Sequence, residues 1–458
     1  MSRPRVLVIS SEPVGERMAG PAIRSLELAR ALAGRCQVTL AAPGPSQVPV
    51  AEPTGASTER SHPEIDLLPA SVEDYATLLA AAERHDVVIA QQLPAQMLGR
   101  VAASDTRYVA DMYNPTVVEA MEALGDRTGR AAERAHRLVT RQARAQLAAA
   151  DLVLCASTRQ RDLWLGGMAL AGYIDPAAYR ADPTLRSRMM VVPFGVPDRD
   201  PAPAPDASPW PGVPDDARVL LWGGGIWRWL DAVTPIRALA RIRERHDGVH
   251  LVFLGTGRPV AADDGVSTAE QAEAEARRLG VLDAGVHFNR GWVPYEQRDR
   301  LLAAAHLGVF AHHDHLETRF AYRTRVLDSL WAGLPVVATE GDVLSELAAG
   351  RDAGVTVPAG DDHAMAAACE QLLEPGAYRA ASDAARTLAD ELRWSTVIEP
   401  LAAWCEDPPP PVARPRRRIW AATATQYPAV AVDVVERSGP RELGRRVVRV
   451  VRRTVRRS

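Results

Sequence analysis

The residues best suited to chemistry lie between Gly308 and Gly341, in the segment GVFAHHDHLETRFAYRTRVLDSLWAGLPVVATEG. An apolar run leads into a polar loop, and a helical stretch with Arg323, Arg325 and Asp328 follows. The start of a helix offers free backbone N–H groups and a partial positive charge, which favour a phosphate. Two arginines add charge, and a carboxylate one turn further on suits ribose hydroxyls. The pattern predicts a nucleotide-sugar site, with Arg323 and Arg325 on the diphosphate and Asp328 on the ribose.

The polar loop at residues 312–317, HHDHLE, is rich in imidazole and carboxylate groups. A metal site would need several of these groups turned to one side, and no second cluster supplies distant ligands, so we expect no metal. Imidazoles and carboxylates are good partners for hydroxyls, which predicts that the loop, including His315, contacts the sugar of the donor. Arg325 and Asp328 lie three residues apart, so a solvent-exposed ion pair is the alternative interpretation.

These residues belong to a chain that alternates apolar, strand-like runs with helical stretches. Such alternation predicts parallel, doubly wound sheets, which place binding groups at the carboxyl ends of their strands. Seven prolines between Pro197 and Pro214 predict an exposed linker, after which the pattern restarts. We therefore expect an α/β protein of two Rossmann-like doubly wound domains that face a cleft. The strands are expected at residues 6–10, 37–41, 86–90, 107–111, 152–156, 219–222, 250–254, 286–288, 307–311 and 336–339.

The expected organisation has five parts. Residues 1–196 form the first Rossmann-like domain, 197–216 the proline-rich linker, and 217–394 the second Rossmann-like domain. A helix at 395–411 is expected to return to the first domain before the basic tail at 412–458.

Three glycines in succession, Gly223-Gly224-Gly225, follow the first strand of the second domain. Because such a run loses much backbone entropy on folding, it indicates a place where the chain needs the space or the φ values. We interpret it as the floor of a phosphate or sugar pocket, with Arg228 on its lining. The alternative is a structural turn, and the spacing does not fit the GxGxxG pattern of dinucleotide-binding loops.

The first domain offers further candidates. Gly20 and Pro21 end a loop before a helix that carries Arg24, and we expect this loop to face the cleft and the acceptor. Asp111 ends an expected strand, a position from which a carboxylate binds or deprotonates an acceptor hydroxyl. The alternatives are an ordinary turn for the loop and a helix cap or turn for Asp111.

Composition narrows the classes of protein that fit. The chain of 458 residues has 54 basic residues, and all of them are arginine. Without lysine, P-loop ATPases and lysine Schiff-base enzymes are excluded. The four cysteines form no CxxC pair, which fits a reducing cytoplasm and predicts neither a zinc ribbon nor a disulfide framework. No apolar stretch approaches the roughly 18 residues that a membrane-spanning helix needs.

Basic residues are concentrated after Val412, which leaves an acidic body and argues against nucleic acid as a partner. Residues 441–458 hold eight arginines, which segregate from the leucine and valines on a helical wheel. That arrangement is typical of a helix that lies on an anionic membrane surface, and a solvated basic tail is the alternative. We therefore predict a cytoplasmic protein, peripheral on the inner membrane face.

The block Leu327–Val337, LDSLWAGLPVV, resembles the L-E-A-M-A-x-G-x-P-V-V motif of GT-B glycosyltransferases of the family 4, group 1 kind. Shorter matches are Gly20-Pro21-Ala22, Gly223-Gly224-Gly225, Phe253–Gly257 and Gly291–Pro294, and the resemblance covers about residues 5 to 405. It implies the GT-B fold, with a nucleotide diphosphate sugar on the C-terminal domain and an acceptor on the N-terminal domain. It also implies retained anomeric configuration and no need for a metal.

The chain departs from this family at several positions. Asp328 stands where the family has its second glutamate, and Phe320 stands where it has the first, so Glu317 is the nearest substitute beside the sugar. Only Arg228 lies near the position of the family's Arg/Lys pair, which leaves the diphosphate to the arginines of the later helix. The histidine of the family's N-terminal domain has no clear match, and Asp111 stands closest.

The residues and the resemblance together predict a glycosyltransferase that moves a sugar from a nucleotide diphosphate donor to a glycan or lipid-linked acceptor. We expect it to act in cell-surface glycan or glycolipid synthesis, with Glu317, Asp111 and Arg325 as catalytic candidates. No cofactor is expected besides the nucleotide sugar. Two alternatives stay open: a nucleotide-sugar epimerase or hydrolase, and a degenerate transferase kept as a scaffold, which Phe320 suggests.

Overall fold

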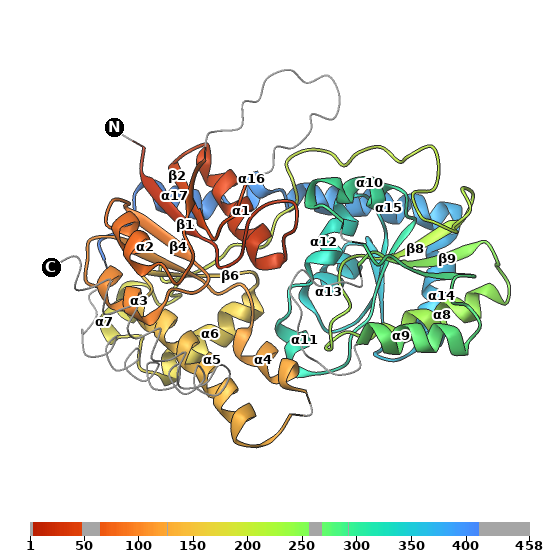
Figure 1. Ribbon diagram of the computed structural model, residues 1–458, viewed down its shortest axis with the longest axis horizontal. Coiled ribbons are helices and arrows are strands. Elements are labelled where there is room, and N and C mark those ends of the chain that lie inside the picture. The colour runs from red at the N-terminus through yellow and green to blue at the C-terminus, as the bar shows by residue number, and fades with distance from the viewer. Residues whose placement is uncertain (1–2, 48–64, 126, 256–267, 292, 412–458) are drawn as a thin grey trace.

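The computed structural model describes residues 3–47, 65–125, 127–255, 268–291 and 293–411. It has two lobes, each built around a parallel sheet with helices on both faces (Figure 1). The predicted α/β fold of two Rossmann-like domains is confirmed. Within these ranges, no helix is both long enough and apolar enough to cross a membrane.

Among the described residues, the N-terminal lobe has a seven-stranded sheet in the order β3-β2-β1-β4-β5-β6-β7. Inner strands such as β4, VVIA, are buried along their whole length, as expected for a parallel sheet covered on both faces. The strand order reverses between β1 and β4, which creates a topological switch point at their carboxyl ends. The strands are β1 (Arg5–Ile9), β2 (Gln37–Ala42), β3 (Asp66–Pro69), β4 (Val87–Ala90), β5 (Arg107–Asp111), β6 (Leu152–Cys155) and β7 (Met189–Val191).

The C-terminal lobe repeats this plan with the order β10-β9-β8-β11-β12-β13. Its switch point lies between β8 and β11, so the loops after these two strands diverge and leave room for a ligand. The strands are β8 (Arg218–Trp222), β9 (Val249–Phe253), β10 (Val286–Phe288), β11 (Leu307–Phe310), β12 (Val336–Thr339) and β13 (Gly354–Val357).

Alternate side chains of each strand pack against helices on opposite faces of the sheet. In the N-terminal lobe, α1 covers one face and α2, α3, α5 and α6 cover the other. In the C-terminal lobe, α12, α13 and α15 lie opposite α8, α9 and α14. The N-terminal helices are α1 (Gly20–Ala33), α2 (Tyr75–Ala82), α3 (Ala95–Val101), α4 (Thr116–Leu124), α5 (Gly129–Ala149), α6 (Thr158–Leu170) and α7 (Pro176–Ala181). Those that follow are α8 (Val233–Arg243), α9 (Thr268–Arg278), the 3-10 turn η1 (Tyr295–Gln297), α10 (Arg298–Ala303), α11 (Leu316–Phe320), α12 (Thr324–Trp331), α13 (Val343–Gly350), α14 (Asp362–Leu373), α15 (Pro375–Glu391), α16 (Trp394–Val397) and α17 (Glu399–Glu406).

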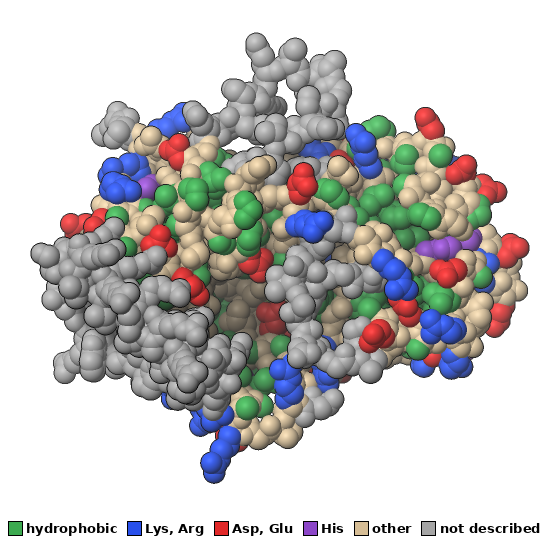
Figure 2. All heavy atoms as spheres, viewed as in Figure 1, with side chains coloured by type: hydrophobic (Ala, Val, Ile, Leu, Met, Phe, Trp, Pro, Cys, Tyr) green, Lys and Arg blue, Asp and Glu red, His purple; other side chains and the backbone are tan. Residues whose placement is uncertain are grey.

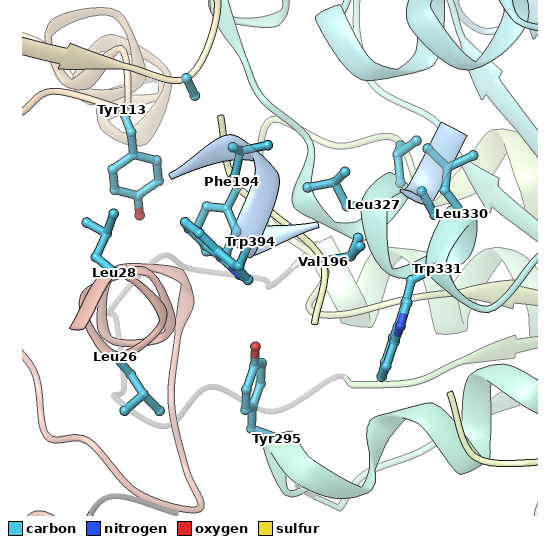
Figure 3. Packing of buried hydrophobic residues seen from close by; sticks show 14 of the residues in the cluster. Leu26, Leu28, Tyr113, Phe194, Val196, Tyr295, Leu327, Leu330, Trp331 and Trp394 are labelled. Atoms are coloured by element: carbon cyan, nitrogen blue, oxygen red, sulfur yellow. The ribbon is translucent and has the colours of Figure 1, made fainter. Parts of the chain in front are cut away.

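One apolar core runs through both lobes where the chain crosses between them. Phe194 and Trp394, on the two crossing segments, have ring centroids 5.5 Å apart, and Tyr113 of the N-terminal lobe packs on Phe194 at 5.9 Å. Figure 3 shows these rings between α1 and Leu327 of α12. A Cβ on Gly195 would lie 2.8 Å from the Trp394 ring, so the crossing needs glycine there. The side chains at this crossing between the lobes, which we call the hinge, are therefore closely packed.

After the crossing, the chain returns to the N-terminal lobe through α16 and α17 (Figure 1). α16 contacts α1, and Arg35 at the end of α1 donates to the carboxylates of Glu399 and Glu406 at 2.6 and 2.5 Å. The polypeptide therefore leaves this lobe near Phe194 and comes back to it at its C-terminal helices.

The structure departs from the expected elements where glycine geometry or tertiary packing overrides the local pattern. The sequence pattern predicts one helical tract at 117–150, but the structure has two helices, α4 and α5, because Gly125 adopts a φ of +53°. The pattern also misses the short strands β3, β7 and β13 and the helices α3, α6, α7, α9, α11, α13, α14 and α15. The linker predicted to be exposed is packed at three apolar positions, since Ala202, Trp210 and Val213 are buried. Thr256, Gly257, Trp292 and the tail at 441–458 lie outside the described residues.

Candidate active site

The carboxyl ends of β8, β11 and β12 lie along one edge of the C-terminal sheet, next to the start of α12. This edge is the candidate site. Arg323 occupies the N-cap position of this helix and no side chain caps it, so the first backbone N–H groups keep their capacity to donate to a ligand. Val326, Leu327 and Leu330 are buried against the sheet, as the predicted apolar stripe requires. This packing directs Arg325 toward the glycine run that follows β8.

Arg325 contributes a partly buried positive charge to this edge. Its Nη2 lies 3.9 Å from the position that a Cβ on Gly224 would take, and its guanidinium lies 5.4 Å from the centre of the Trp222 ring. Gly224 has a φ of +88°, which explains the need for glycine there. Arg325 Nη1 is buried and has no hydrogen-bond partner among the described residues. Burial, and then the neighbouring Arg323, lower the pKa of Arg325 to about 9, so it remains a cation at neutral pH.

Glu317 and Arg323 form a bidentate ion pair next to this charge. The distances are 3.0 Å from Nη1 to Oε1 and 2.5 Å from Nη2 to Oε2. Glu317 lies in the first turn of α11, which His315 caps by accepting from the Thr318 N–H at 3.4 Å. His315 Nε2 also lies 4.0 Å from a carboxylate oxygen of Glu122 in the other lobe. The structure thus brings these predicted residues together, with the charge of Arg323 already engaged by Glu317.

Several buried polar atoms of this edge lack a hydrogen-bond partner among the described residues. Native proteins rarely leave many such atoms unpaired in one place, so the cluster has the character of a ligand site. In the part of the chain that the structure describes, no group of three or more His, Cys, Asp or Glu could hold a metal ion. The unpaired atoms are His312 Nδ1, His315 Nε2, Arg323 Nε, Arg325 Nη1 and Ser345 Oγ.

The N-terminal lobe adds a carboxylate that sequence reasoning missed. Helix α4 contacts α11 of the other lobe, and Glu119 of α4 lies within reach of the charges of Glu317 and Arg323. Burial, and then the negative charge of Glu317, raise the pKa of Glu119 to about 7, although Arg323 opposes the shift. No local motif marks Glu119, because its environment arises from two segments far apart in the sequence.

Asp111 ends β5 as predicted, but it faces the protein interior. Its carboxylate accepts from Nε and Nη2 of Arg24 at 2.8 Å each, and the two side chains are 1% and 0% exposed. Arg24 also donates to the carbonyls of Val192 and Pro193 and lies over the ring of Tyr113. This geometry gives the pair a structural role at the base of the hinge and does not bring Asp111 to an acceptor.

Gly20 and Pro21 form the first turn of α1, after the loop that follows β1. A Cβ on Gly20 would lie 3.6 Å from the Tyr113 hydroxyl, so this turn lies beside the carboxyl end of β5. The carbonyl of Glu16, earlier in the same loop, accepts from the Tyr295 N–H of the other lobe at 3.4 Å. The loop therefore borders the other lobe, while Arg24 one turn later is turned inward.

Asp328 and Arg228 lie at the margins of the edge. Asp328 is one turn beyond Arg325 on α12, and its Oδ1 accepts from Arg298 Nε at 3.2 Å. It pairs with Arg298 rather than with Arg325, and its side chain is 36% exposed. The guanidinium of Arg228 lies against the other lobe, 2.3 Å from the position that a Cβ on Gly125 would take. Only Asp328 of these two lies on the same helix as the unpaired cation.

Further contacts between the lobes border the site. Gln160 of α6 donates to the Phe320 carbonyl at 2.9 Å, and Arg159 donates to the Gly341 carbonyl at 2.7 Å. Figure 2 shows the surface hollowed between the two lobes. A ligand held at the start of α12 therefore has elements of both lobes around it.

A family model described as "Glycosyl transferases group 1" matches residues 217–375. The matched segment runs from the residue before β8 to the start of α15, so it includes Arg325, the Glu317–Arg323 pair and the glycine run. Glu119 lies outside it, on the other lobe.

Several solved structures share the fold over most of this chain. Sucrose-phosphate synthase from Thermosynechococcus elongatus aligns with a TM-score of 0.60 and 17% identity, over 88% of this chain and 98% of that one. The Anabaena protein Alr3699/HepE, solved with UDP and glucose, aligns at 0.58 and 13% identity, over 88% and 100%. WaaG, a glycosyltransferase involved in lipopolysaccharide biosynthesis, aligns at 0.54 and 17% identity, over 88% and 100%. No curated protein matches the sequence significantly.

The resemblance first seen in the block Leu327–Val337 is confirmed. The protein has the GT-B fold, and the segment that matches the group 1 model makes up most of its C-terminal domain.

Proposed function

We propose that this protein transfers a sugar from a nucleotide diphosphate donor to a hydroxyl acceptor, with retained anomeric configuration and without a metal. The observation that carries the proposal is Arg325, a partly buried cation whose buried Nη1 has no partner among the described residues. It lies at the uncapped start of α12 and beside the glycine run at 223–225. A diphosphate has the charge and the acceptor oxygens that this arrangement lacks.

In the proposed reaction, the bond between the anomeric carbon and the diphosphate breaks, and the acceptor oxygen forms a new bond to that carbon while its proton passes to the departing diphosphate. Negative charge grows on the departing diphosphate, where Arg325 and the N–H groups of α12 stabilise it. Asp328 is proposed to accept from the ribose hydroxyls. Glu317, held by Arg323, is proposed to line the sugar. Enclosure between the lobes orients the acceptor and limits competition from water.

The proposal is tested by incubating the full chain with UDP-, GDP- and dTDP-sugars and a lipid extract, and by measuring release of free nucleotide. We expect release with at least one donor. The variant Arg325→Met is expected to lower this rate by about 100-fold or more, because it removes a charge aimed at the leaving group. The control is Arg245→Met, which alters an exposed arginine of the same lobe paired with Glu370 at 2.6 Å. No release with any donor contradicts the proposal.

Two alternatives have distinct outcomes in the same assay. A hydrolase releases nucleotide without any acceptor, so an undiminished rate in the absence of lipid extract would favour it. An epimerase releases no nucleotide and instead converts one nucleotide sugar into another, which chromatography of the same reaction mixture detects. A degenerate transferase that serves as a scaffold, suggested by Phe320, releases no nucleotide. Calorimetry with UDP, GDP and dTDP then tells an inactive but nucleotide-binding protein from one whose site binds nothing.

We further propose that the acceptor is a cell-surface glycan or glycolipid precursor, reached from the cytoplasmic face of the inner membrane. The charge pattern supports this. Besides the tail at 441–458, α5 carries Arg130, Arg137 and Arg144 exposed at seven-residue spacing, and hence along one side of the helix. Figure 1 shows α5 extending with α4 from the N-terminal lobe. A line of arginines on an otherwise acidic body suits an anionic surface.

Membrane binding is tested with phosphatidylglycerol vesicles and with phosphatidylcholine vesicles as the neutral control. Deletion of residues 441–458 is expected to abolish sedimentation with the anionic vesicles, while the unfolding temperature stays the same. Replacing Arg130, Arg137 and Arg144 by glutamate in the full chain is expected to weaken this binding, because each basic residue near such a surface contributes about 1 kcal/mol. Equal binding by the truncated and full chains would refute the role of the tail.

A further inference from the structure

His312 lies at the carboxyl end of β11, on the same edge as Arg325. Its backbone N–H donates to the Thr339 hydroxyl at 3.3 Å, and it forms an antiparallel bridge with Leu230 from the loop after β8. The residue is 2% exposed. Its backbone is therefore held from two sides, and its ring has a defined position in the site.

Asp342 holds the ring in one orientation. One of its oxygens caps α13 by accepting from the N–H groups of Leu344 and Ser345 at 2.9 and 3.1 Å. The other lies 3.3 Å from His312 Nε2. Burial alone would raise the pKa of Asp342, but the hydrogen bond with His312 and then the surrounding charges, that of Arg323 included, outweigh it, so the pKa is lowered.

An ionised Asp342 accepts hydrogen bonds only, so Nε2 of His312 must donate to it. In the neutral ring, the other nitrogen, Nδ1, then carries a lone pair and no proton. This atom is buried and has no partner among the described residues. A buried acceptor left unsatisfied costs about 1–3 kcal/mol, so a ligand that donates to it gains binding energy.

The chemistry of Nδ1 selects the kind of ligand group. A lone pair repels phosphate oxygens, which carry no proton at neutral pH, and it attracts an O–H. His312 follows β11 and bridges Leu230 in the loop after β8, so it lies on the same edge of the sheet as the proposed diphosphate position. In a nucleotide sugar, the groups next to the diphosphate that donate O–H bonds are the sugar hydroxyls.

We propose that His312 accepts a hydrogen bond from a hydroxyl of the transferred sugar through Nδ1, and that Asp342 acts as the positioning residue that orients the ring. The proposal rests on the proposed nucleotide-sugar function. It makes His312 a determinant of donor specificity, because a site built to bind a hydroxyl discriminates strongly against a sugar that lacks it.

Two substitutions separate the two ring nitrogens. His312→Asn places its amide oxygen close to the position of Nδ1, so an acceptor for the sugar is kept. His312→Gln reaches the position of Nε2 and keeps a donor for Asp342, but it removes the acceptor at Nδ1. Calorimetry with the full chain compares UDP with UDP-glucose, GDP with GDP-mannose and dTDP with dTDP-glucose.

We expect His312→Gln to weaken binding of the nucleotide sugar by about 10- to 100-fold and to leave binding of the matching nucleotide diphosphate unchanged. His312→Asn is expected to retain most of the sugar affinity. Asp342→Asn should also lower the sugar affinity, because the ring loses its fixed orientation. Unfolding temperatures check that each variant is folded.

The outcomes separate this inference from the proposed function. If His312→Gln weakens sugar and bare diphosphate equally, or weakens neither, His312 is only a structural residue and the inference is overturned while the nucleotide-sugar function stands. If wild-type protein binds none of the three nucleotide diphosphates, the proposed function falls, and the inference falls with it.

Discussion

Arg24 and Arg325 both lie near the start of a helix, Arg24 fully buried in one lobe and Arg325 partly buried in the other, yet their surroundings differ. Arg24 is bonded to both oxygens of Asp111 and to the carbonyls of Val192 and Pro193. Arg325 has Trp222 against its guanidinium and an Nη1 without a partner among the described residues. One lobe has therefore neutralised its buried cation internally, and the other has not.

This difference separates a structural charge from one directed at a ligand. A buried ion pair with all its donors satisfied serves the packing around it, here the hinge between the lobes. A buried cation without a hydrogen-bonded anion lowers the stability of the protein alone and gains energy when an anion binds. The comparison predicts opposite effects at the two sites. Breaking the pair of Arg24 should lower the stability of the protein, whereas removing the charge of Arg325 should lower activity without lowering stability.

The largest effect is expected when the satisfied pair is broken. Asp111→Asn leaves Arg24 buried without its counter-charge, and we expect the free energy of unfolding to fall by about 3–5 kcal/mol. Urea denaturation followed by circular dichroism measures the loss. Asp86→Asn is the matched control, because Asp86 pairs with Arg5 at the surface, where 46% of its side chain is exposed. A loss as small as that of the control would show that the Arg24–Asp111 pair does not support the hinge.

The opposite result is expected at Arg325. Arg325→Met replaces the unpaired cation by an apolar side chain of similar length, which should leave the unfolding free energy unchanged or raise it by about 1 kcal/mol. Transfer activity should still fall by about 100-fold or more. The same urea denaturation, with nucleotide release measured on the same preparation, tests both halves. A clear loss of stability together with full activity would reverse the assignment of roles to the two arginines.

Much of the fold can be predicted from the sequence because its signals are local. Apolar runs such as 336–339 mark buried parallel strands, and the alternation of strands and helices determines the doubly wound plan. The block Leu327–Val337 identifies α12 and its apolar face, and with it the region of the donor site. Short edge elements such as β3 and β7 escape prediction, since tertiary contacts rather than periodicity hold them in place.

The partners of the charged residues are much harder to predict. Asp111 ends its strand as expected, but its ion pair with Arg24 joins residues 87 positions apart. No sequence motif marks Asp342, because its role depends on the packing of β11 against β12. Whether a buried polar group is satisfied is a property of the assembled structure, and in this protein several unsatisfied atoms gather at the candidate site while both oxygens of Asp111 are paired.

Glu119 provides a third case, a carboxylate whose environment depends on both lobes. Its pKa is raised to about 7, first by burial and then by Glu317, while Arg323 opposes the shift. This pKa lies above the value in the unfolded state. Below about pH 4.5 Glu119 is protonated in both the folded and the unfolded states, so its burial does not lower the stability there. The folded state then loses stability as the pH rises from there through 7. The charged form is therefore tolerated at the contact between α4 and α11 only at a cost.

Glu119→Gln removes this titration, and we expect its free energy of unfolding to exceed that of the wild type by about 2 kcal/mol at pH 8 and to match it near pH 4.5. Denaturation at a series of pH values measures the difference. Glu133→Gln, which alters an exposed carboxylate of α5, should follow the wild-type pH dependence. If Glu119→Gln also followed it, Glu119 would have to be solvated or paired in the folded state, as Asp111 is. The contact between α4 and α11 would then carry no charge penalty, and the buried charges without partners would be confined to the C-terminal lobe.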